Sequence, residues 1–170
     1  MNPSENPHWR PMTAADLAAV AALSSRVHPN FPERPEVLAE KFRLFPQGCF
    51  ALSAGGTLAG YCFSHPWIKD APPPALDHLL GEMPPKADSY FIHDLTLDAS
   101  IRRRNLAARL VPALMQAARD TKIAHMTLVA VNGTSPFWSR MGFARTEDEA
   151  IQAQAREKYD ACAVHMQRDL

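Results

Sequence analysis

LTLDASIRRRNLAA, residues 95–108, is the stretch that decides the fold of this chain. It begins at the end of an apolar run, residues 90–97, whose composition predicts a β-strand. After the basic loop, apolar residues recur every three or four positions, which predicts a helix over 105–119. The stretch therefore predicts a strand, a short basic loop and a helix in direct succession.

This succession predicts an anion site. The first backbone N–H groups of a helix have no partner within the helix, and they attract negative charge. Ala107 and Ala108 are small enough to let a diphosphate approach the helix, and Arg102-Arg103-Arg104 supplies side chains that pair well with phosphate oxygens. The cluster suits one polyanionic small ligand better than a nucleic-acid track.

Further elements are predicted on both sides of this stretch. Thr13 and Asp16 have the spacing of a helix capping box, and Gly55-Gly56 separates two apolar runs in the manner of a hairpin. The expected order predicts an α+β fold around a mixed sheet, formed as one domain by residues 1–170. The expected elements are helices after Thr13 and at 35–45, strands at 49–54 and 58–64, a strand at 126–131, a short helix at 135–141, and strands near 143 and at 161–167.

The connection over residues 67–89 is long and rich in proline. Connections of this length without secondary structure are usually functional or disordered. Its prolines and the Leu79-Leu80 pair favour an ordered segment, with a short helix at 75–81. We expect it to act as a lid over an acceptor site, with His65-Pro66-Trp67 as a candidate part of that site.

Composition excludes several classes of protein. The chain has 18 basic and 18 acidic side chains, so it lacks the net positive field that nucleic-acid binding usually needs. Its three cysteines, an odd number without close spacing, indicate a reducing compartment rather than a disulfide framework. We find no apolar leader and no stretch long enough to span a bilayer, so we expect a cytoplasmic protein without membrane or nucleic-acid partners.

Residues 102–107 resemble the coenzyme-binding signature of the GNAT superfamily of N-acetyltransferases. That signature has Gln or Arg, two free positions, Gly, one free position, and then Gly or Ala. Here Arg102 and Ala107 match, whereas Asn105 replaces the glycine; asparagine tolerates the backbone shapes for which glycine is used. Asn132, followed by the aromatic segment 137–143, resembles the second landmark of the family.

The resemblance implies the GNAT-like fold, a central mixed, mostly antiparallel, twisted sheet with flanking helices. It implies acetyl-CoA as cosubstrate, no metal, and direct transfer of acetyl to a primary amine of a small-molecule or peptide acceptor in a ternary complex. By position, main-chain groups of Leu95 and Leu97 would pair with pantetheine, Asn132 would touch its amides and Trp138 would lie near the thioester sulfur. The remaining implied coenzyme contacts are Arg102, Arg103, Arg104, Asn105, Leu106, Ala107 and Ala108.

His93 is the candidate general base, because an unperturbed histidine titrates near pH 6.5. Alternation along an ideal strand would place His93 on the same face as Leu95 and Leu97. The position also resembles that of a histidine in arylalkylamine N-acetyltransferases. Alternatively, His93 is a structural histidine beside Asp94, and a bulge before Leu95 would let Asp94 take the role of base.

The general acid is not apparent from the sequence. Many family members carry a tyrosine where this chain has Trp138, and an indole N–H cannot act as a titrating acid. Trp138 is then a packing residue, and either Tyr90 or Tyr159 protonates the thiolate or the thiolate leaves unaided. His93, His125 and His165 lack metal-ligand spacing.

Two further alternatives remain open. The replacements at Asn105 and Trp138 are also compatible with a non-catalytic acyl-CoA binding module. The predicted C-terminal strand at 161–167 could pair across a homodimer.

Overall fold

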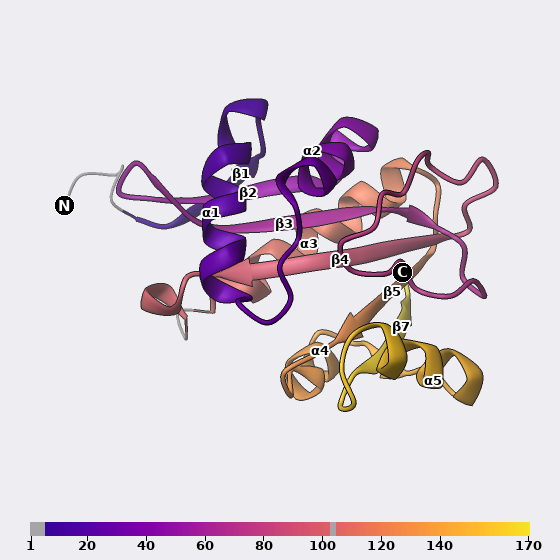
Figure 1. The fold of residues 1–170 in the computed structure, drawn as a ribbon. Coiled ribbons are helices and arrows are strands. Elements are labelled where there is room, and N and C mark those ends of the chain that lie inside the picture. Colours follow the sequence, from indigo (N-terminus) through magenta and orange to yellow (C-terminus); the bar gives the residue numbers. More distant parts are fainter. Residues whose placement is uncertain (1–5, 103–104) are drawn as a thin grey trace.

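The strands of this chain form one mixed sheet of seven strands, in the order β1-β2-β3-β4-β5-β7-β6 (Figure 1). The computed structural model describes residues 6–102 and 105–170. Every adjacent pair of strands is antiparallel except β4 and β5, which are parallel at the centre. The strands are β1 (His8–Pro11), β2 (Cys49–Ala54), β3 (Thr57–Trp67), β4 (Ser89–Leu97), β5 (His125–Ala130), β6 (Ala144–Arg145) and β7 (Val164–Asp169).

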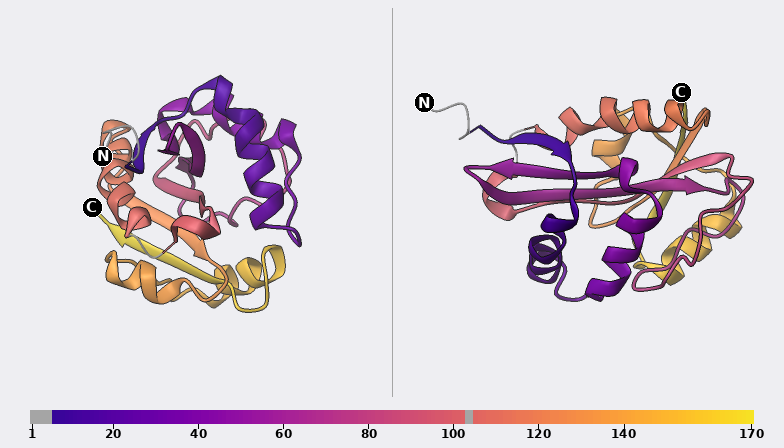
Figure 2. Two further views of the ribbon diagram at one scale, coloured as in Figure 1. Left: turned by 90° about the vertical axis from the view of Figure 1, so that its left-hand side faces the viewer. Right: turned by 90° about the horizontal axis from the view of Figure 1, so that it is seen from above.

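Helices cover both faces of the sheet, as the view from above in Figure 2 shows. The helix α3 packs its apolar stripe on one face, against Tyr90, Ile92 and Met126. On the opposite face, α1 and α2 bury Leu23 and Leu38 against β2 and β3. The helices are α1 (Leu17–Val27), α2 (Pro35–Leu44), α3 (Leu106–Asp120), α4 (Ser135–Arg140) and α5 (Glu149–Lys158). The predicted α+β architecture with a mixed sheet is confirmed.

The predicted cap at the first helix is confirmed. The carboxylate of Asp16 accepts a hydrogen bond from the backbone N–H of Thr13 at 2.8 Å. A single 3-10 turn, Ala14–Asp16, lies between this cap and the start of α1.

Two elements were not predicted. β1 pairs with β2 at the edge of the sheet, and the indole N–H of its Trp9 donates to the carbonyl of Leu106 at 2.8 Å. α5 has few apolar residues; it is held through Gln152, whose buried amide donates to the carbonyl oxygens of Thr146 and His165. Polar contacts of this kind leave no hydrophobic period in the sequence.

The C-terminal strand is not an edge of the sheet. β7 lies between β5 and β6, and β6 covers it at Gln167 and Met166. Pairing of this strand across a homodimer stays a prediction, and β6 already occupies its outer side at these two residues.

The expected helix at 75–81 is wrong. Residues 68–88 form an irregular connection. Several of its backbone groups bond to side chains outside the connection: Glu40 of α2 accepts from the N–H groups of Leu80 and Gly81, and Tyr159 beside α5 donates to Pro74. Within the described part of the chain, no helix is both long and apolar enough to cross a membrane.

Candidate active site

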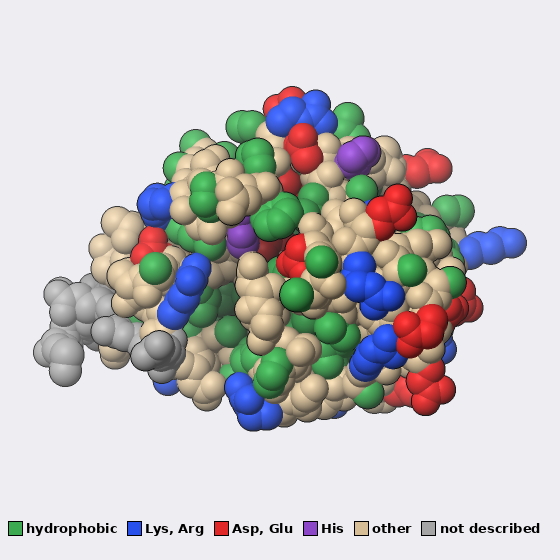
Figure 3. Space-filling model, turned by 60° about the horizontal axis from the view of Figure 1, so that its bottom comes forward, with side chains coloured by type: hydrophobic (Ala, Val, Ile, Leu, Met, Phe, Trp, Pro, Cys, Tyr) green, Lys and Arg blue, Asp and Glu red, His purple; other side chains and the backbone are tan. Residues whose placement is uncertain are grey.

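A cavity of about 580 Å³ opens where β4 and β5 separate. The two strands pair at only three positions, the last being Ile92 with Leu128. Beyond that point β4 follows β3 while β5 follows β7, so residues 93–97 have no partner in β5. On the face shown in Figure 3 this region is hollowed, with hydrophobic side chains in the hollow and a histidine and acidic side chains beside it.

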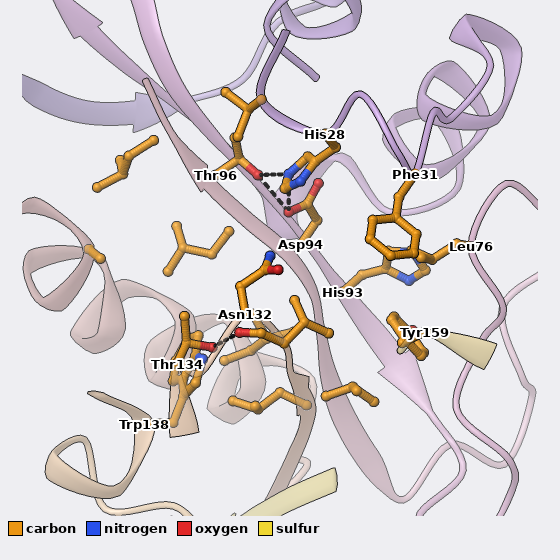
Figure 4. A pocket seen from close by; sticks show the side chains of 18 of the residues that line it. His28, Phe31, Leu76, His93, Asp94, Thr96, Asn132, Thr134, Trp138 and Tyr159 are labelled. Carbon is orange, nitrogen blue, oxygen red and sulfur yellow. Dashed lines mark hydrogen bonds and ion pairs between the residues drawn. The ribbon is translucent and has the colours of Figure 1, made fainter. Parts of the chain in front are cut away.

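The cavity has two ends, which Figure 4 separates clearly. We call one end the helix wall, because it lies around the starts of α3 and α4. The other end, the loop wall, comes from the connections after α1 and β3, from strand β4 and from the end of α5. The helix wall comprises Leu95, Leu97, Arg102, Ala107, Asn132 and Trp138, and the loop wall comprises Phe31, Glu33, Leu76, His93, Tyr159 and Asp160.

The helix wall contains most of the residues that the sequence placed beside a coenzyme. Of the remaining predicted contacts, Asn105 and Ala108 do not line the cavity, and Leu106 is buried against Ile101 and Leu52. These three residues were expected to contact the coenzyme through their backbone N–H groups. The positions of their side chains do not test that expectation. Arg103 and Arg104 lie outside the described residues.

Asn105 adopts the conformation that a glycine would supply. Its φ is +56° and its ψ is 21°, in the left-handed region, and it immediately precedes the first residue of α3. A residue without the tolerance of asparagine or glycine is strained there. The replacement of glycine by Asn105 therefore preserves the backbone turn.

The predicted face of His93 is wrong, because β4 has a bulge. Phe63 pairs with Asp94 and the next residue of β3 pairs with Ile92, which leaves His93 as the extra residue. Consecutive residues at a bulge no longer alternate in the usual way. His93 contacts Phe91 and His65 on the face covered by α1 and α2, whereas Leu95 packs against the α3 cluster on the other face.

Hydrogen bonds define the tautomer of His93. Nδ1 of His65 lies 2.9 Å from the carbonyl oxygen of Pro66, so it carries a proton and donates it. Nε2 of neutral His65 is then an acceptor for Nδ1–H of His93, at 3.4 Å. The lone pair of His93 is consequently on Nε2, a buried atom with no hydrogen-bond partner among the described residues.

The surroundings keep both histidines neutral. Burial lowers the pKa of His93 well below its usual 6.5. The positive charge of Lys41 and, to a smaller extent, that of His65 lower it further. Burial also lowers the pKa of His65 to about 4. At neutral pH, Nε2 of His93 is therefore available to accept a proton.

Asp94 faces the same side as His93 but has different surroundings. Its two carboxylate oxygens accept from the hydroxyl groups of Tyr61, at 2.7 Å, and Thr96, at 2.8 Å. Burial raises the pKa of Asp94, although His28, 4.0 Å away, opposes this. Since the Thr96 proton goes to Asp94, Nε2–H of His28 must donate to Thr96, at 2.8 Å (Figure 4).

His28 and Glu33 are site residues that the sequence analysis missed. Both lie in the connection that begins at the end of α1 and line the cavity from outside the sheet. Glu33 forms an ion pair with Lys41 at 2.7 Å, and the side chains are 4% and 1% exposed. A charged residue four positions before a basic one on a predicted helix would have suggested a pair, but Glu33 and Lys41 are eight apart.

Trp138 and the two candidate acids, Tyr90 and Tyr159, occupy different places. Trp138 is buried, with its ring edge-on to those of Phe137 and Phe143, as expected of a packing residue. Tyr90 is buried away from the cavity, with its hydroxyl 2.8 Å from that of Ser64. Tyr159 lies on the loop wall, and its hydroxyl donates to the carbonyl of Pro74 at 2.6 Å. Burial raises the pKa of both tyrosines.

Metal-ligating side chains do not converge in this region. No group of three or more His, Cys, Asp or Glu side chains suited to a metal occurs within residues 6–102 and 105–170.

Solved structures share this fold at low sequence identity. The loading GNATL domain of CurA from Lyngbya majuscula aligns with a TM-score of 0.78 at 14% identity, covering 96% of this chain and 98% of that one. Ard1 from Thermoplasma volcanium has a TM-score of 0.72 at 14% identity, covering 96% and 97%. Naa50 from Arabidopsis thaliana, in complex with the bisubstrate analogue CoA-Ac-MVNAL, has a TM-score of 0.68 at 10% identity, covering 96% and 99%.

Sequence comparison points to the same family. A search of curated proteins gives no match. The sequence profile described as the Acetyltransferase (GNAT) family matches residues 17–143, which is more than two thirds of the chain. This protein belongs to the GNAT acetyltransferase family.

Proposed function

We propose that this protein transfers an acetyl group from acetyl-CoA to a primary amine of a small-molecule or peptide acceptor, by direct attack in a ternary complex. One observation carries the proposal. A continuous cavity runs from the start of α3 to His93, whose buried Nε2 has no hydrogen-bond partner among the described residues. It therefore has room for a donor at one end and a proton acceptor at the other.

The helix wall suits a coenzyme. Residues 93–97 have no strand partner in β5, so the backbone around Leu95 and Leu97 can pair with the amides of pantetheine. The start of α3 supplies free N–H groups for a pyrophosphate, with Arg102 at its edge. Asn132 extends toward the middle of the cavity in Figure 4, in reach of the same arm. The relative from Arabidopsis thaliana was solved with a CoA-containing analogue.

His93 is the proposed general base. As the amine nitrogen forms its bond to the acetyl carbonyl carbon, Nε2 of His93 takes the proton that nitrogen must lose, and the carbon–sulfur bond then breaks. Asp94 is a weaker candidate because both of its carboxylate oxygens already accept from hydroxyl groups. We assign Asp94, with Thr96, to holding His28 at the rim of the cavity.

The transfer proceeds without a covalent enzyme intermediate. Cys49, Cys62 and Cys162 all lie away from the cavity lining. Burial also raises the pKa of Cys49, to about 12, and that of Cys62. Neither buried thiol therefore provides a thiolate nucleophile at neutral pH.

The leaving thiolate has no dedicated side-chain acid in this proposal. Trp138 packs at the helix wall and cannot titrate, and Tyr90 does not line the cavity. Tyr159 lies at the opposite end of the cavity from Trp138 in Figure 4. The thiolate is then released as such, which its own acidity permits, and it takes a proton from water.

Calorimetry followed by a thiol-release assay tests the proposal. We expect micromolar binding of acetyl-CoA, weakened about tenfold to a hundredfold in Arg102→Glu because a charge-assisted contact becomes a repulsion. Arg119→Glu, at the exposed far end of α3, is the matched control and should bind normally. Thiol release must then depend on added amine. Binding without release for any amine would favour the alternative, a non-catalytic acyl-CoA binding module.

A further inference from the structure

We infer that the acceptor is a diamine, with one amine that reacts beside His93 and a second, protonated nitrogen that binds Glu33. This inference rests on the proposed function, since it describes the acceptor of the same site. It is drawn from the charges and the free polar atoms of the loop wall.

Glu33 presents an oxygen that lacks a donor. Its Oε2 accepts from Nζ of Lys41 at 2.7 Å and from the N–H of Asp77 at 3.3 Å. Its Oε1 has no hydrogen bond to any described residue, although the side chain is only 4% exposed and lines the cavity. Oε1 is not one of the fully buried atoms without a partner, so it keeps some accessible surface and still lacks a hydrogen-bond donor among the described residues. A ligand that brings an N–H group into the cavity would supply one.

The charge of the loop wall selects a cation as that donor. Glu33 and Asp160 lie on this wall and Asp94 beside it, and Arg102 at the helix wall is the single Lys or Arg side chain among the described residues that line the cavity. Lys41 neutralises Glu33 from behind but is not in the lining. Asp94 has only His28 beside it, at 4.0 Å, and Asp160 has no Lys or Arg neighbour in the described lining, so an acceptor that carries a carboxylate would meet mainly like charge on the loop wall.

The side chains around His93 on the loop wall are largely apolar. In Figure 4 the rings of Phe31 and Tyr159 and the side chain of Leu76 gather around His93. The hydroxyl of Tyr159 is already engaged with Pro74, so this ring offers only its apolar body to a ligand. A methylene chain suits such a surface better than a hydroxylated or amide-rich chain. The acceptor class is thus an alkyl diamine.

Three acceptors with four-carbon chains isolate the charge at the far end. Butylamine, putrescine and γ-aminobutyrate each offer a primary amine, and their other ends are neutral, cationic and anionic. In the thiol-release assay with the full-length protein, we expect kcat/KM for putrescine to exceed that for butylamine by at least about tenfold. About twofold would follow from its two equivalent amines alone. γ-Aminobutyrate should be the poorest acceptor. Pentylamine and cadaverine repeat the comparison with a longer spacer.

A paired variant assigns the preference to Glu33. Glu33→Gln alone would leave Lys41 buried without its partner and could unfold the protein, so it is combined with Lys41→Met. In the folded double variant, the putrescine-to-butylamine ratio should fall to about two. Glu36→Gln, at an exposed position of α2, the helix that carries Lys41, is the control and should keep the wild-type ratio.

The outcomes separate this inference from the proposed function. If kcat/KM for putrescine exceeded that for butylamine by no more than the statistical factor of about two, the diamine inference would be overturned. Thiol release with these amines would still support the proposed transfer. A preference for putrescine that persists in the folded double variant would overturn the assignment to Glu33. Absence of thiol release with all amines would instead overturn the proposed function itself.

Discussion

The two walls of the cavity are built in different ways. The helix wall comes largely from one continuous segment, residues 95–107, in which a strand, a turn and a helix follow directly. The loop wall is assembled from side chains that are far apart in sequence, such as Phe31, Leu76 and Tyr159. The first offers mainly backbone groups, whereas the second offers an imidazole, carboxylates and aromatic rings.

This difference divides the work of the enzyme. Backbone N–H groups at a helix start bind phosphate whatever the acceptor is, so the helix wall suits a common donor. Side chains from separate connections can change independently, so the loop wall suits a particular acceptor. Substitutions on the loop wall should therefore alter turnover and acceptor choice, and those on the helix wall should alter coenzyme affinity.

The largest expected effect is that of His93→Ala. Removal of a positioned general base should lower kcat by about 10²-fold to 10⁴-fold. Because His93 lies on the loop wall, the Kd for acetyl-CoA should change by less than about threefold. Steady-state rates with a saturating diamine, together with calorimetry, measure the two effects separately.

His8→Ala, at the exposed end of β1, controls for loss of a histidine elsewhere. A normal kcat in His93→Ala would move the role of base to Asp94, the other candidate at the bulge. A large loss of acetyl-CoA affinity in His93→Ala would contradict the assignment of donor binding to the helix wall and acceptor binding to the loop wall.

The second effect concerns acid stability, which His93 of the loop wall and its neighbour His65 should limit. Folding lowers the pKa of His65 to about 4 and lowers that of His93, so below pH 6.5 the unfolded chain binds protons that the folded chain does not. Their contribution to stability is complete above pH 6.5 and is lost as the pH falls toward the folded pKa values. From pH 7.5 to pH 5 the loss should be about 2 kcal/mol for His65, and His93 should add a loss of the same sign.

Urea unfolding at the two pH values measures this loss. The variant His65→Asn/His93→Asn should lose at least about 2 kcal/mol less than the wild type over the same interval. His8→Gln, at an exposed position, should follow the wild type. An equal loss in the double variant would show that acid sensitivity arises outside the loop wall, for example at His165, whose pKa burial also lowers to about 4.

The same difference explains how much the sequence could predict. The strand at Tyr90, the helix beginning near Asn105 and the position of Trp138 were all apparent, because periodicity and a local motif specify them. Leu95 and Leu97 followed from the same segment. A wall built from one continuous segment can be predicted from the residue pattern of that segment.

The loop wall was predicted only at His93, Tyr159 and, in outline, the connection at 67–89. Even there the face of His93 was wrong, because one extra residue in β4 reverses the alternation that the prediction assumed. Glu33 and His28 carry no local pattern, and their partners Lys41 and Thr96 lie elsewhere in the sequence. Side chains that act through distant partners become visible only in the folded chain.

The smallest expected effect tests whether the helix wall depends on backbone shape alone. Asn105 has a φ of +56°, so Asn105→Gly should keep both stability and the Kd for acetyl-CoA within about twofold of wild type. Asn105→Ala retains a Cβ without the tolerance of asparagine and should cost about 1 kcal/mol of stability. It should also weaken acetyl-CoA binding, since α3 would start in a different conformation. Asn30→Ala, at an exposed residue outside the set with positive φ, provides the control for thermal unfolding and calorimetry. If Asn105→Gly kept the stability of the wild type but bound acetyl-CoA as weakly as Asn105→Ala, the asparagine side chain would itself contact the coenzyme, and the helix wall would no longer be a surface of backbone groups.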